Sequence, residues 1–426
     1  IELAYEQVSG DAVVVYNDNT ADPNYRVWNG TSWGAATNLD VPTTGLPNVI
    51  ELTAKPGTDI IAMLQDTVNS DVYGALWDGS AWDDMNGGGV EPAWDLTAST
   101  NIRHPIDVAF EKTSGDAMFI WADATSTDYY YRTLVGSTLS SATLLDITAS
   151  GGVGHWVTLE SDPSTGSDKI LLGVEDAGLD INTREWTGSA WDSAHTEHTS
   201  SSEDIIDSNF DLTYETYTGH EGKAWLTYSY SSTIYRKQYN GSASWGTATA
   251  MTSGDDTAFI DLEAQPISGA LLAVAYEDNT SASDDIKDYT STNGGSTWSS
   301  AGTIWGGPIA RNYGFDRVDI ETVKYIAGIT ISGTCKAYDQ TTDCGDTGEV
   351  RVAVNGVLNS VNVQSTVAGT WSITNFPKPA ANDILTIFID GASDADEAVA
   401  VTKYSGNGDV TGIKLIKEGI VIGSNQ

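Results

Sequence analysis

The eight residues Ser291-Thr292-Asn293-Gly294-Gly295-Ser296-Thr297-Trp298 predict a tight turn that places a tryptophan at the start of a strand. The Asn-Gly-Gly core favours the positive φ angles of a hairpin turn. Five weaker copies of this turn occur earlier in the chain. Four end in Trp: Asn29–Trp33, Asp78–Trp82, Thr187–Trp191 and Asn240–Trp245. The fifth, Val135–Leu139, has Leu in place of Trp. Six copies of one turn indicate a repeated structural unit.

Each turn is preceded by the same succession of strand-like segments. A first short strand carries an acid in five units and Thr158 in the sixth; the acids are Glu2, Glu51, Asp107, Asp211 and Asp261. A nearly all-apolar strand follows, a third strand leads into the turn, and a fourth begins at the Trp. Four antiparallel strands that repeat every ~50 residues are typical of a β-propeller blade. No helical periodicity competes with this interpretation.

The motif Ser291-x-Asn293-x-Gly295-x-Thr297-Trp298 resembles the Asp-box of sialidase-like propellers, with Asn in the place of Asp. The resemblance extends over about residues 1–322 as a repeat design. It implies a propeller fold but no particular activity, because Asp-box turns occur in sialidases, in other glycan-active enzymes and in non-enzymatic propellers. We expect six blades, with seven as the alternative because Phe315–Val318 or Val318–Glu321 has the pattern of one more first strand.

The sequence pattern changes at about Tyr325, where the glycine turns stop and segments with the alternating pattern of strands begin. Seven short strands within ~100 residues predict a β-sandwich, and the last of them is Ile413–Ile422. The runs Ile331–Thr334, Val354–Gly356 and Gly369–Ile373 resemble bacterial Ig-like modules of the carboxypeptidase-regulatory or prealbumin type, which implies a spacer, adhesion or assembly module. The chain is therefore predicted to be all-β, with a propeller at 1–322 and an Ig-like sandwich at 323–426.

Two features of the second domain have two interpretations each. The terminal segment with Ile413, Leu415, Ile420 and Ile422 is either the last strand of the sandwich or a strand that pairs with the sheet edge of a neighbouring subunit. Cys335 and Cys344 are spaced for a disulfide that closes a hairpin, with two free thiols as the alternative. A disulfide would indicate an oxidising compartment.

Composition excludes several classes of partner. Twenty Lys and Arg against 59 Asp and Glu give a net charge of −39, which excludes nucleic acid and anionic membrane surfaces as partners. No stretch approaches the ~20 apolar residues of a membrane span. This balance is typical of a secreted or cell-surface protein. Because Ile1 is not an initiator Met, we expect a processed chain or a segment of a longer one.

The repeated acids are the main candidates for cation binding. If they point into the channel of the propeller, like charges converge and raise one another's pKa unless a cation such as Ca²⁺ lies among them. The alternative is that each carboxylate accepts hydrogen bonds from backbone N–H groups between blades. A second candidate is the acidic loop with Asp390, Asp394 and Asp396, which is either a Ca²⁺ loop or a solvated turn. We expect that the protein requires no cofactor, with bound Ca²⁺ as the alternative.

A catalytic set is hard to find. Sialidase chemistry needs three arginines, a Tyr–Glu pair and an acidic Asp, and we place Arg26, Arg132, Arg184 and Arg236 at one repeated third-strand position rather than in a site. His195 and His198 point to opposite faces of a strand and predict no metal pair. Most Trp residues are expected in blade cores, which leaves Tyr129 and Tyr130 as candidates for contact with glycans.

The sequence thus favours a non-enzymatic extracellular structural or adhesive protein. In this hypothesis the propeller is presented or polymerised by the Ig-like module in a surface layer, filament or adhesin, and its partners are further copies, other surface proteins or glycans. The alternative is a carbohydrate-binding propeller or a diverged sialidase-like glycoside hydrolase.

Overall fold

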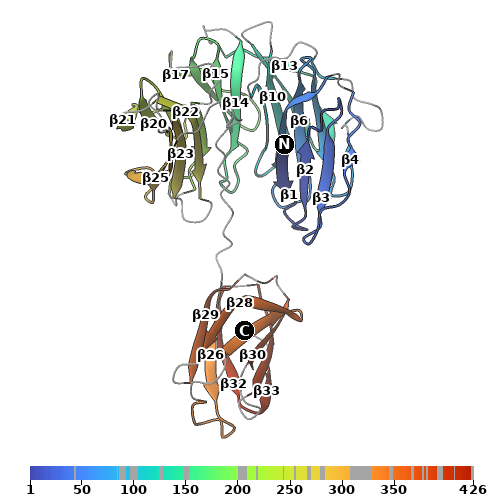
Figure 1. Ribbon diagram of the computed structural model, residues 1–426, viewed down its shortest axis with the longest axis vertical. Helices are drawn as coiled ribbons and strands as arrows, with labels where there is room; N and C mark the ends of the chain where they lie inside the picture. The colour runs from blue at the N-terminus through green and yellow to red at the C-terminus, as the bar shows by residue number, and fades with distance from the viewer. Residues whose placement is uncertain are drawn as a thin grey trace. The chain divides into compact units, whose positions relative to one another are not determined.

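The chain forms two compact units, Ile1–Val323 and Lys324–Gln426, seen in a computed structural model (Figure 1). The structure describes residues 1–426 except 43–44, 84, 86–92, 96–103, 124–127, 148–152, 200–208, 217–218, 243, 254–255, 266–269, 279–283, 308–328, 345–348, 366–368, 377–378, 380–381, 391–396, 407 and 424–426. The described residues form strands and turns, and among them there is no helix with the length and hydropathy needed to cross a membrane.

The described part of unit 1 contains six antiparallel sheets, here called blades 1 to 6 in chain order. Blade 1 contains β1 (Glu2–Tyr5), β2 (Ala12–Tyr16), β3 (Asn24–Trp28) and β4 (Thr37–Asn38). Blade 2 contains β5 (Pro47–Ala54), β6 (Ile61–Thr67), β7 (Val72–Trp77) and β8 (Trp82–Asp83). Blade 3 contains β9 (Ile106–Phe110), β10 (Ala117–Ala122), β11 (Tyr129–Val135) and β12 (Thr138–Leu139), and β13 (Thr143–Leu145) also pairs with β11.

The other three blades repeat this order. Blade 4 contains β14 (Gly154–Ser161), β15 (Ile170–Asp176), β16 (Ile181–Trp186) and β17 (His195–His198). Blade 5 contains β18 (Phe210–Tyr214), β19 (Ala224–Ser229), β20 (Thr233–Tyr239) and β21 (Thr249–Ser253). Blade 6 contains β22 (Asp256–Ala264), β23 (Leu271–Asp278), β24 (Asp284–Ser291) and β25 (Ser299–Gly307). The suggested further strand at Phe315–Glu321 lies outside the described residues.

Hydrophobic contact between blades holds unit 1 together. Every residue of β6, β10, β15 and β19 is buried, as the apolar composition of the second strands predicts. Buried side chains form separate clusters between blades 1 and 2, 2 and 3, 3 and 4, 4 and 5, and 5 and 6. The first strands of consecutive blades also contact one another, from β1 and β5 onward to β18 and β22. The first strands therefore lie side by side in one layer, here called the inner layer, and the other strands of each blade continue its sheet away from that layer.

The glycine turns have the predicted local chemistry. Gly30, Gly79, Gly188 and Gly241 have φ between 82° and 94°, a region in which a Cβ is unfavourable. The side chain that opens the turn caps it: Asp78 Oδ1, for example, accepts hydrogen bonds from the backbone N–H groups of Ser80 and Ala81, both at 2.8 Å. In the longest turn Asn293 Oδ1 accepts from Thr297 N at 2.9 Å, and Ser291 Oγ accepts from Gly295 N at 2.9 Å.

Unit 2 is a sandwich of two sheets around one core. One sheet has the order β29 (Thr370–Phe376), β26 (Ile329–Lys336), β32 (Val410–Ile416). The other has the order β28 (Val357–Ser365), β27 (Glu349–Val354), β30 (Ile384–Asp390), β31 (Ala398–Lys403), β33 (Gly419–Ile422). Inward residues from both sheets, among them Val352, Trp371 and Ile387, form one buried cluster.

The prediction of one strand over Ile413–Ile422 is wrong. The chain turns at Lys417 and Glu418, where Glu418 has a φ of 57°, so that β32 and β33 belong to different sheets. Each pairs in parallel, β32 with β26 and β33 with β31. Leu415 is fully buried and Ile413 packs against the core, whereas Ile420 and Ile422 are 72% and 81% exposed. The four residues proposed for an assembly strand therefore divide into two core residues and two surface residues.

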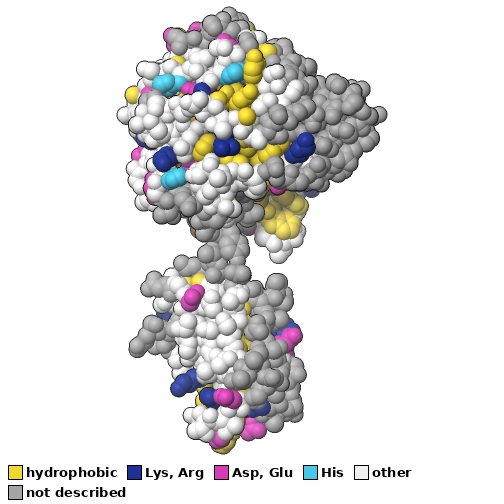
Figure 2. All heavy atoms as spheres, turned by 90° about the vertical axis from the view of Figure 1, so that its left-hand side faces the viewer, with side chains coloured by type: hydrophobic (Ala, Val, Ile, Leu, Met, Phe, Trp, Pro, Cys, Tyr) yellow, Lys and Arg dark blue, Asp and Glu magenta, His cyan; other side chains and the backbone are white. Residues whose placement is uncertain are grey.

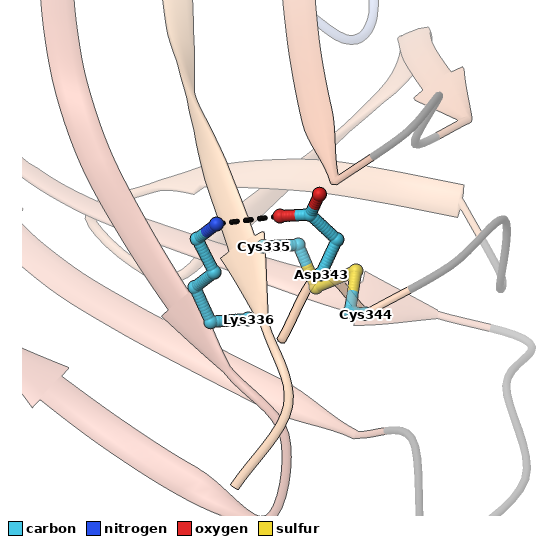
Figure 3. The surroundings of a disulfide bond; sticks show 4 residues. All are labelled: Cys335, Lys336, Asp343 and Cys344. Atoms are coloured by element: carbon cyan, nitrogen blue, oxygen red, sulfur yellow. Dashed lines mark hydrogen bonds and ion pairs between the residues drawn. A yellow bond between two sulfur atoms is a disulfide. The ribbon is translucent and has the colours of Figure 1, made fainter. Parts of the chain in front are cut away.

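A disulfide joins Cys335, on β26, to Cys344 (Figure 3). Their Cα atoms are 5.4 Å apart and both residues are buried. The loop between them is held by an ion pair of Lys336 with Asp343 and by Asp339, whose Oδ1 accepts hydrogen bonds from Thr341 N and Thr342 N. The bond thus closes a hairpin at the edge of the sandwich core.

Candidate functional site

Two of the repeated acids join neighbouring blades through backbone hydrogen bonds. Asp107 on β9 accepts from Val108 N through Oδ1 and from Leu159 N of blade 4 through Oδ2, both at 2.6 Å. Asp211 on β18 does the same with Leu212 N and with Leu262 N of blade 6, both at 2.8 Å. This geometry matches the second interpretation of the acids, in which carboxylates cap N–H groups between blades.

The same acids also converge electrostatically. Burial raises the pKa of Asp107 to about 7, with a further contribution from Glu51, which pairs with His104. Burial followed by repulsion from Asp261 raises the pKa of Asp211 well above its ordinary value. These pKa shifts reflect two close pairs of acids, Glu51 with Asp107 in blades 2 and 3 and Asp211 with Asp261 in blades 5 and 6.

Blade 4 contributes Glu160, which the repeat pattern missed. Burial and the neighbouring carboxylates of Glu263, Asp107 and Asp261 raise its pKa well above the ordinary value. Glu160 lies two residues after Thr158 and therefore on the same face of β14. That spacing of two was the signal in the sequence that could have identified it.

No group of three or more His, Cys, Asp or Glu in the described parts of the chain is arranged to hold a metal ion. Glu2 lies on β1, in the first strand of blade 1. Asp390 pairs with Arg351 at 2.9 Å, and Asp394 and Asp396 lie outside the described residues. Binding of Ca²⁺ by any of these carboxylates stays a prediction.

Aromatic triads lie between blades 1 and 2 and between blades 3 and 4. At the first junction the ring of Tyr25 lies 5.8 Å from that of Trp77 and 6.2 Å from that of Trp82. At the second, Tyr131 lies 6.1 Å from Trp186 and 5.9 Å from Trp191. In both cases the Tyr belongs to the odd-numbered blade and the two Trp residues to the even-numbered one.

Each of these two junctions also contains a buried acid. Glu6 accepts a hydrogen bond from Trp77 Nε1 at 2.5 Å, and Glu111 accepts one from Trp186 Nε1 at 2.6 Å. The first two pairs of blades, 1 with 2 and 3 with 4, are therefore closed in the same way, by a Tyr, two indoles and a carboxylate.

The junction of blades 5 and 6 departs from this pattern at Arg236. Strand register places Tyr25 opposite Val15, Tyr131 opposite Ile120 and Arg236 opposite Thr227, always the fourth residue of the second strand. Arg236 therefore occupies the position of the tyrosines. Its Cζ lies 5.9 Å from the ring centroids of Trp225, on β19 of its own blade, and of Trp298, in the turn of blade 6. Only one of the two indoles at this junction therefore comes from the even-numbered blade.

The expectation that four arginines share one position is consequently wrong for Arg236. Arg26, Arg132 and Arg184 lie three residues before the first residue of their turn, whereas Arg236 lies four residues before Asn240. A shift of one residue turns a strand side chain to the opposite face. Lys237 takes the other position and contacts the preceding blade, pairing with Glu197 at 2.6 Å.

The guanidinium of Arg236 differs from the other arginines in its contacts. Arg184 donates to the backbone oxygens of Asp192 and Asp146, and Arg132 donates to that of Ser140. Within the described part of the chain, the guanidinium of Arg236 has no hydrogen-bond acceptor or carboxylate partner, and it lies beside the two indoles. Burial lowers its pKa, because a half-buried cation is partly removed from water.

The acid of this junction, Glu215, has both carboxylate oxygens engaged by partners other than Arg236. Its Oε1 accepts from Gln238 Nε2 at 2.5 Å, and its Oε2 pairs with His220. The turn of blade 6 lies directly over His220 and Glu215, since a Cβ on Gly294 would be 2.7 Å from His220 Nδ1 and 3.1 Å from Glu215 Oε2. The next residue of the turn, Gly295, is equally close to Trp225, because its Cβ would be 2.2 Å from that ring. On the side of unit 1 that carries β20 to β25, hydrophobic side chains gather in a band with Lys and Arg side chains among them (Figures 1 and 2).

The Trp residues of the glycine turns are less buried than expected. Trp33 is 41% exposed, and the corresponding residues of blades 2, 4, 5 and 6 are half-buried: Trp82, Trp191, Trp245 and Trp298. Conversely, Tyr129 is fully buried in the cluster between blades 3 and 4, so its proposed role in glycan contact is wrong. Tyr130 is half-buried and stacks on Trp121 at 6.0 Å.

No protein-family model matches this chain, and no curated protein is similar to it in sequence. Among solved structures, the BP39L lectin from Burkholderia pseudomallei is similar with a TM-score of 0.50 at 9% identity, over 71% of this chain and 83% of the lectin. The six-bladed fucose-binding lectin of Aleuria aurantia is similar with a TM-score of 0.40 at 11% identity, over 73% of this chain and 97% of the lectin. An ulvan lyase of a polysaccharide lyase family is similar with a TM-score of 0.43 at 11% identity, over 71% of this chain and 82% of the lyase. The likeness is one of fold, and it confirms the predicted β-propeller.

Proposed function

We propose that unit 1 is a six-bladed propeller that binds carbohydrate without altering it, and that unit 2 is an Ig-like module that presents or joins such propellers outside the cell. The observation that carries the glycan-binding proposal is the recurrence of a partly exposed indole at the same outer turn in five blades. An indole offers a flat apolar face together with a polar edge, which suits the mixed surface of a sugar ring.

Two further points support binding rather than catalysis. On the first strands, Asp107 and Asp211 cap backbone N–H groups between blades, and Glu51 pairs with His104. Glu215 is held by Gln238 and His220. The similar BP39L protein is a lectin by its name. A hydrolase would instead need two carboxylates free to flank a glycosidic bond.

The test is a glycan array followed by titration calorimetry on the full chain. The variant is Trp33→Ala, chosen because this indole is the most exposed of the five. We expect the number of sugar sites per chain to fall by one. The matched control is Tyr338→Ala, an aromatic residue that is 74% exposed in unit 2, and it should leave binding unchanged. Absence of binding to every glycan tested contradicts the proposal, and release of new reducing ends indicates an enzyme instead.

The assembly role rests on the two outer strands of one sheet of unit 2. Along the order β28-β27-β30-β31-β33 the first three pairings are antiparallel and the last is parallel, so β28 and β33 run in opposite directions. A second copy placed beside the first by translation would therefore pair its β28 antiparallel to β33. Exposed aliphatic residues lie on both edges: Val357 (74%) and Ile422 (81%) are the most exposed.

Light scattering and electron microscopy of the full chain test this assembly. We expect filaments or larger particles that are lost in a variant with both Ile420→Lys and Ile422→Lys. Addition of a calcium chelator shows whether the carboxylates bridge subunits through a cation. A monomer under all conditions contradicts the assembly role and leaves glycan binding to be judged by calorimetry.

A further inference from the structure

We propose that the junction of blades 5 and 6 binds the anionic group of an acidic sugar, with Arg236 as its partner and Trp298 as the surface for the sugar ring. This inference rests on the proposed glycan-binding function and specifies the ligand of one junction. The shared chemistry of the ligand is a carboxylate or sulfate carried on a pyranose ring.

The first step is the comparison of the three paired junctions. Two of them are closed by Tyr25 and Tyr131, each of which meets two indoles and places an uncharged phenol at this position. The fold therefore does not need a cation at this position. Its replacement by Arg236 in the third junction puts a guanidinium where its two repeats have a phenol. A charged departure from a repeated apolar contact points to a role outside packing.

The second step concerns the charge of Arg236 and its partners. Partly buried arginines are usually paired, because removing a charge from water is unfavourable unless another charge or several hydrogen bonds compensate. The chain has 59 acids against 20 Lys and Arg, so a carboxylate partner is easy to supply. Among the described residues none is supplied to Arg236. The nearby Glu215 is directed to Gln238 and His220 instead.

The third step is the geometry of the guanidinium. A guanidinium presents a planar fork of donors that matches a carboxylate or sulfate in a bidentate way. The rings of Trp225 and Trp298 meet edge to face at 6.3 Å, and Arg236 lies over both. Trp225 is buried, whereas Trp298 is half-buried. A cation beside a partly exposed indole therefore suits a ring that carries an anionic substituent.

The contrasting explanation is that Arg236 only packs on the two indoles as a cation–π contact. The variant Arg236→Tyr separates the two explanations, because it restores the residue found at the other two junctions and is expected to fold. Arg236→Gln is a second variant that keeps a polar donor but removes the charge. The matched control is Arg26→Gln, which removes an exposed arginine from the third strand of blade 1.

The experiment is titration calorimetry of the full chain with four oligosaccharides of equal length: an oligogalacturonate, its methyl ester, a sulfated oligogalactan and a neutral oligogalactan. We expect at least one anionic ligand to bind at least tenfold more tightly than its uncharged counterpart. Arg236→Tyr and Arg236→Gln should remove that preference without changing the melting temperature by more than ~3 °C, and Arg26→Gln should retain it. Stronger binding of the sulfated sugar than of the uronate identifies sulfate as the recognised group.

The outcomes are distinguishable. If neutral and anionic sugars bind equally, or if both Arg236 variants keep the preference, the inference is overturned while the glycan-binding function stands. If none of the sugars binds and the glycan array is also empty, both proposals fall. Loss of the preference together with retained binding of the neutral sugar supports both.

Discussion

Asp66 allows a quantitative test of how burial controls stability in the propeller. This residue lies on β6, is completely buried, and is weakly compensated by a long contact of 3.4 Å from Asn48 Nδ2 to its Oδ2 and by the backbone N–H of Thr67. Burial, followed by the nearby charge of Asp71, raises its pKa from 3.8 to about 7. The folded state therefore binds this proton more tightly than the unfolded state, and the free energy of unfolding increases as the pH falls through 7 toward 3.8.

The magnitude follows from the shift. At pH 8.5 the folded protein holds an ionised buried carboxylate, whereas at pH 5 the group is neutral when folded and ionised when unfolded. The free energy of unfolding increases by about 1.4 kcal/mol for each pH unit below the folded-state pKa of about 7. The two units from pH 7 to pH 5 therefore account for an increase of about 3 kcal/mol between pH 8.5 and pH 5. Asp66→Asn replaces the titrating group by a neutral one of the same shape. We expect this part of the pH dependence to disappear and the variant to be the more stable protein at pH 8.5 by about 1 to 3 kcal/mol, after allowance for one unpaired amide donor.

The assay is urea denaturation at pH 5, 7 and 8.5, followed by tryptophan fluorescence. Thirteen of the 14 tryptophans lie in unit 1, so the signal reports mainly on the propeller. The control is Asp40→Asn, which changes an exposed carboxylate in the same unit and should not alter the pH profile. An Asp66→Asn variant with the same pH profile as the parent, or one less stable than the parent at pH 8.5, would refute the reasoning.

Three further predictions follow from the contacts. Gly295→Ala should lower the free energy of unfolding by more than ~2 kcal/mol, because the residue has a φ of 73° and its new Cβ would lie 2.2 Å from Trp225; an unchanged urea midpoint would count against this packing. Asp211→Ala should cost roughly 2 kcal/mol or more, since it leaves two backbone N–H groups of blades 5 and 6 without their acceptor, and hydrogen exchange at Leu212 and Leu262 should accelerate if the caps are real. Replacing Cys335 and Cys344 together by Ser should destabilise unit 2 by ~2–3 kcal/mol while calorimetry shows the transition of unit 1 unmoved.

Much of the fold was predictable because it is local. The positive φ angles at the Asn-Gly and Asp-Gly turns, the apolar second strands and the repeat of ~50 residues all follow from side chains close in the chain. The loss of those turns also predicts a second unit near the end of the chain, and the chain does form two compact units. Six blades, an Asp-box relationship and an Ig-like relationship for unit 2 stay predictions, because fold likeness at 9% identity does not resolve them.

The candidate site was less predictable. The four arginines looked equivalent because their spacing to the turn differs by one residue only for Arg236, and that residue reverses the face. The pattern of repeated acids stopped at Thr158, although Glu160 lies on the same face two residues later. The terminal apolar segment looked continuous because one turn at Lys417 and Glu418 carries no Pro or Asn-Gly signal.

By itself the sequence determined what depends on neighbours in the chain: strand length, turn chemistry, the repeat and the position of the two cysteines. The tertiary structure alone decided which groups meet across blades. Asp107 and Leu159 are 52 residues apart, and Arg236 and Trp298 belong to different blades, so no local pattern reports their contact. The physical reason is that a strand fixes only the alternation of its side chains, whereas stacking of whole sheets determines which side chain faces which partner.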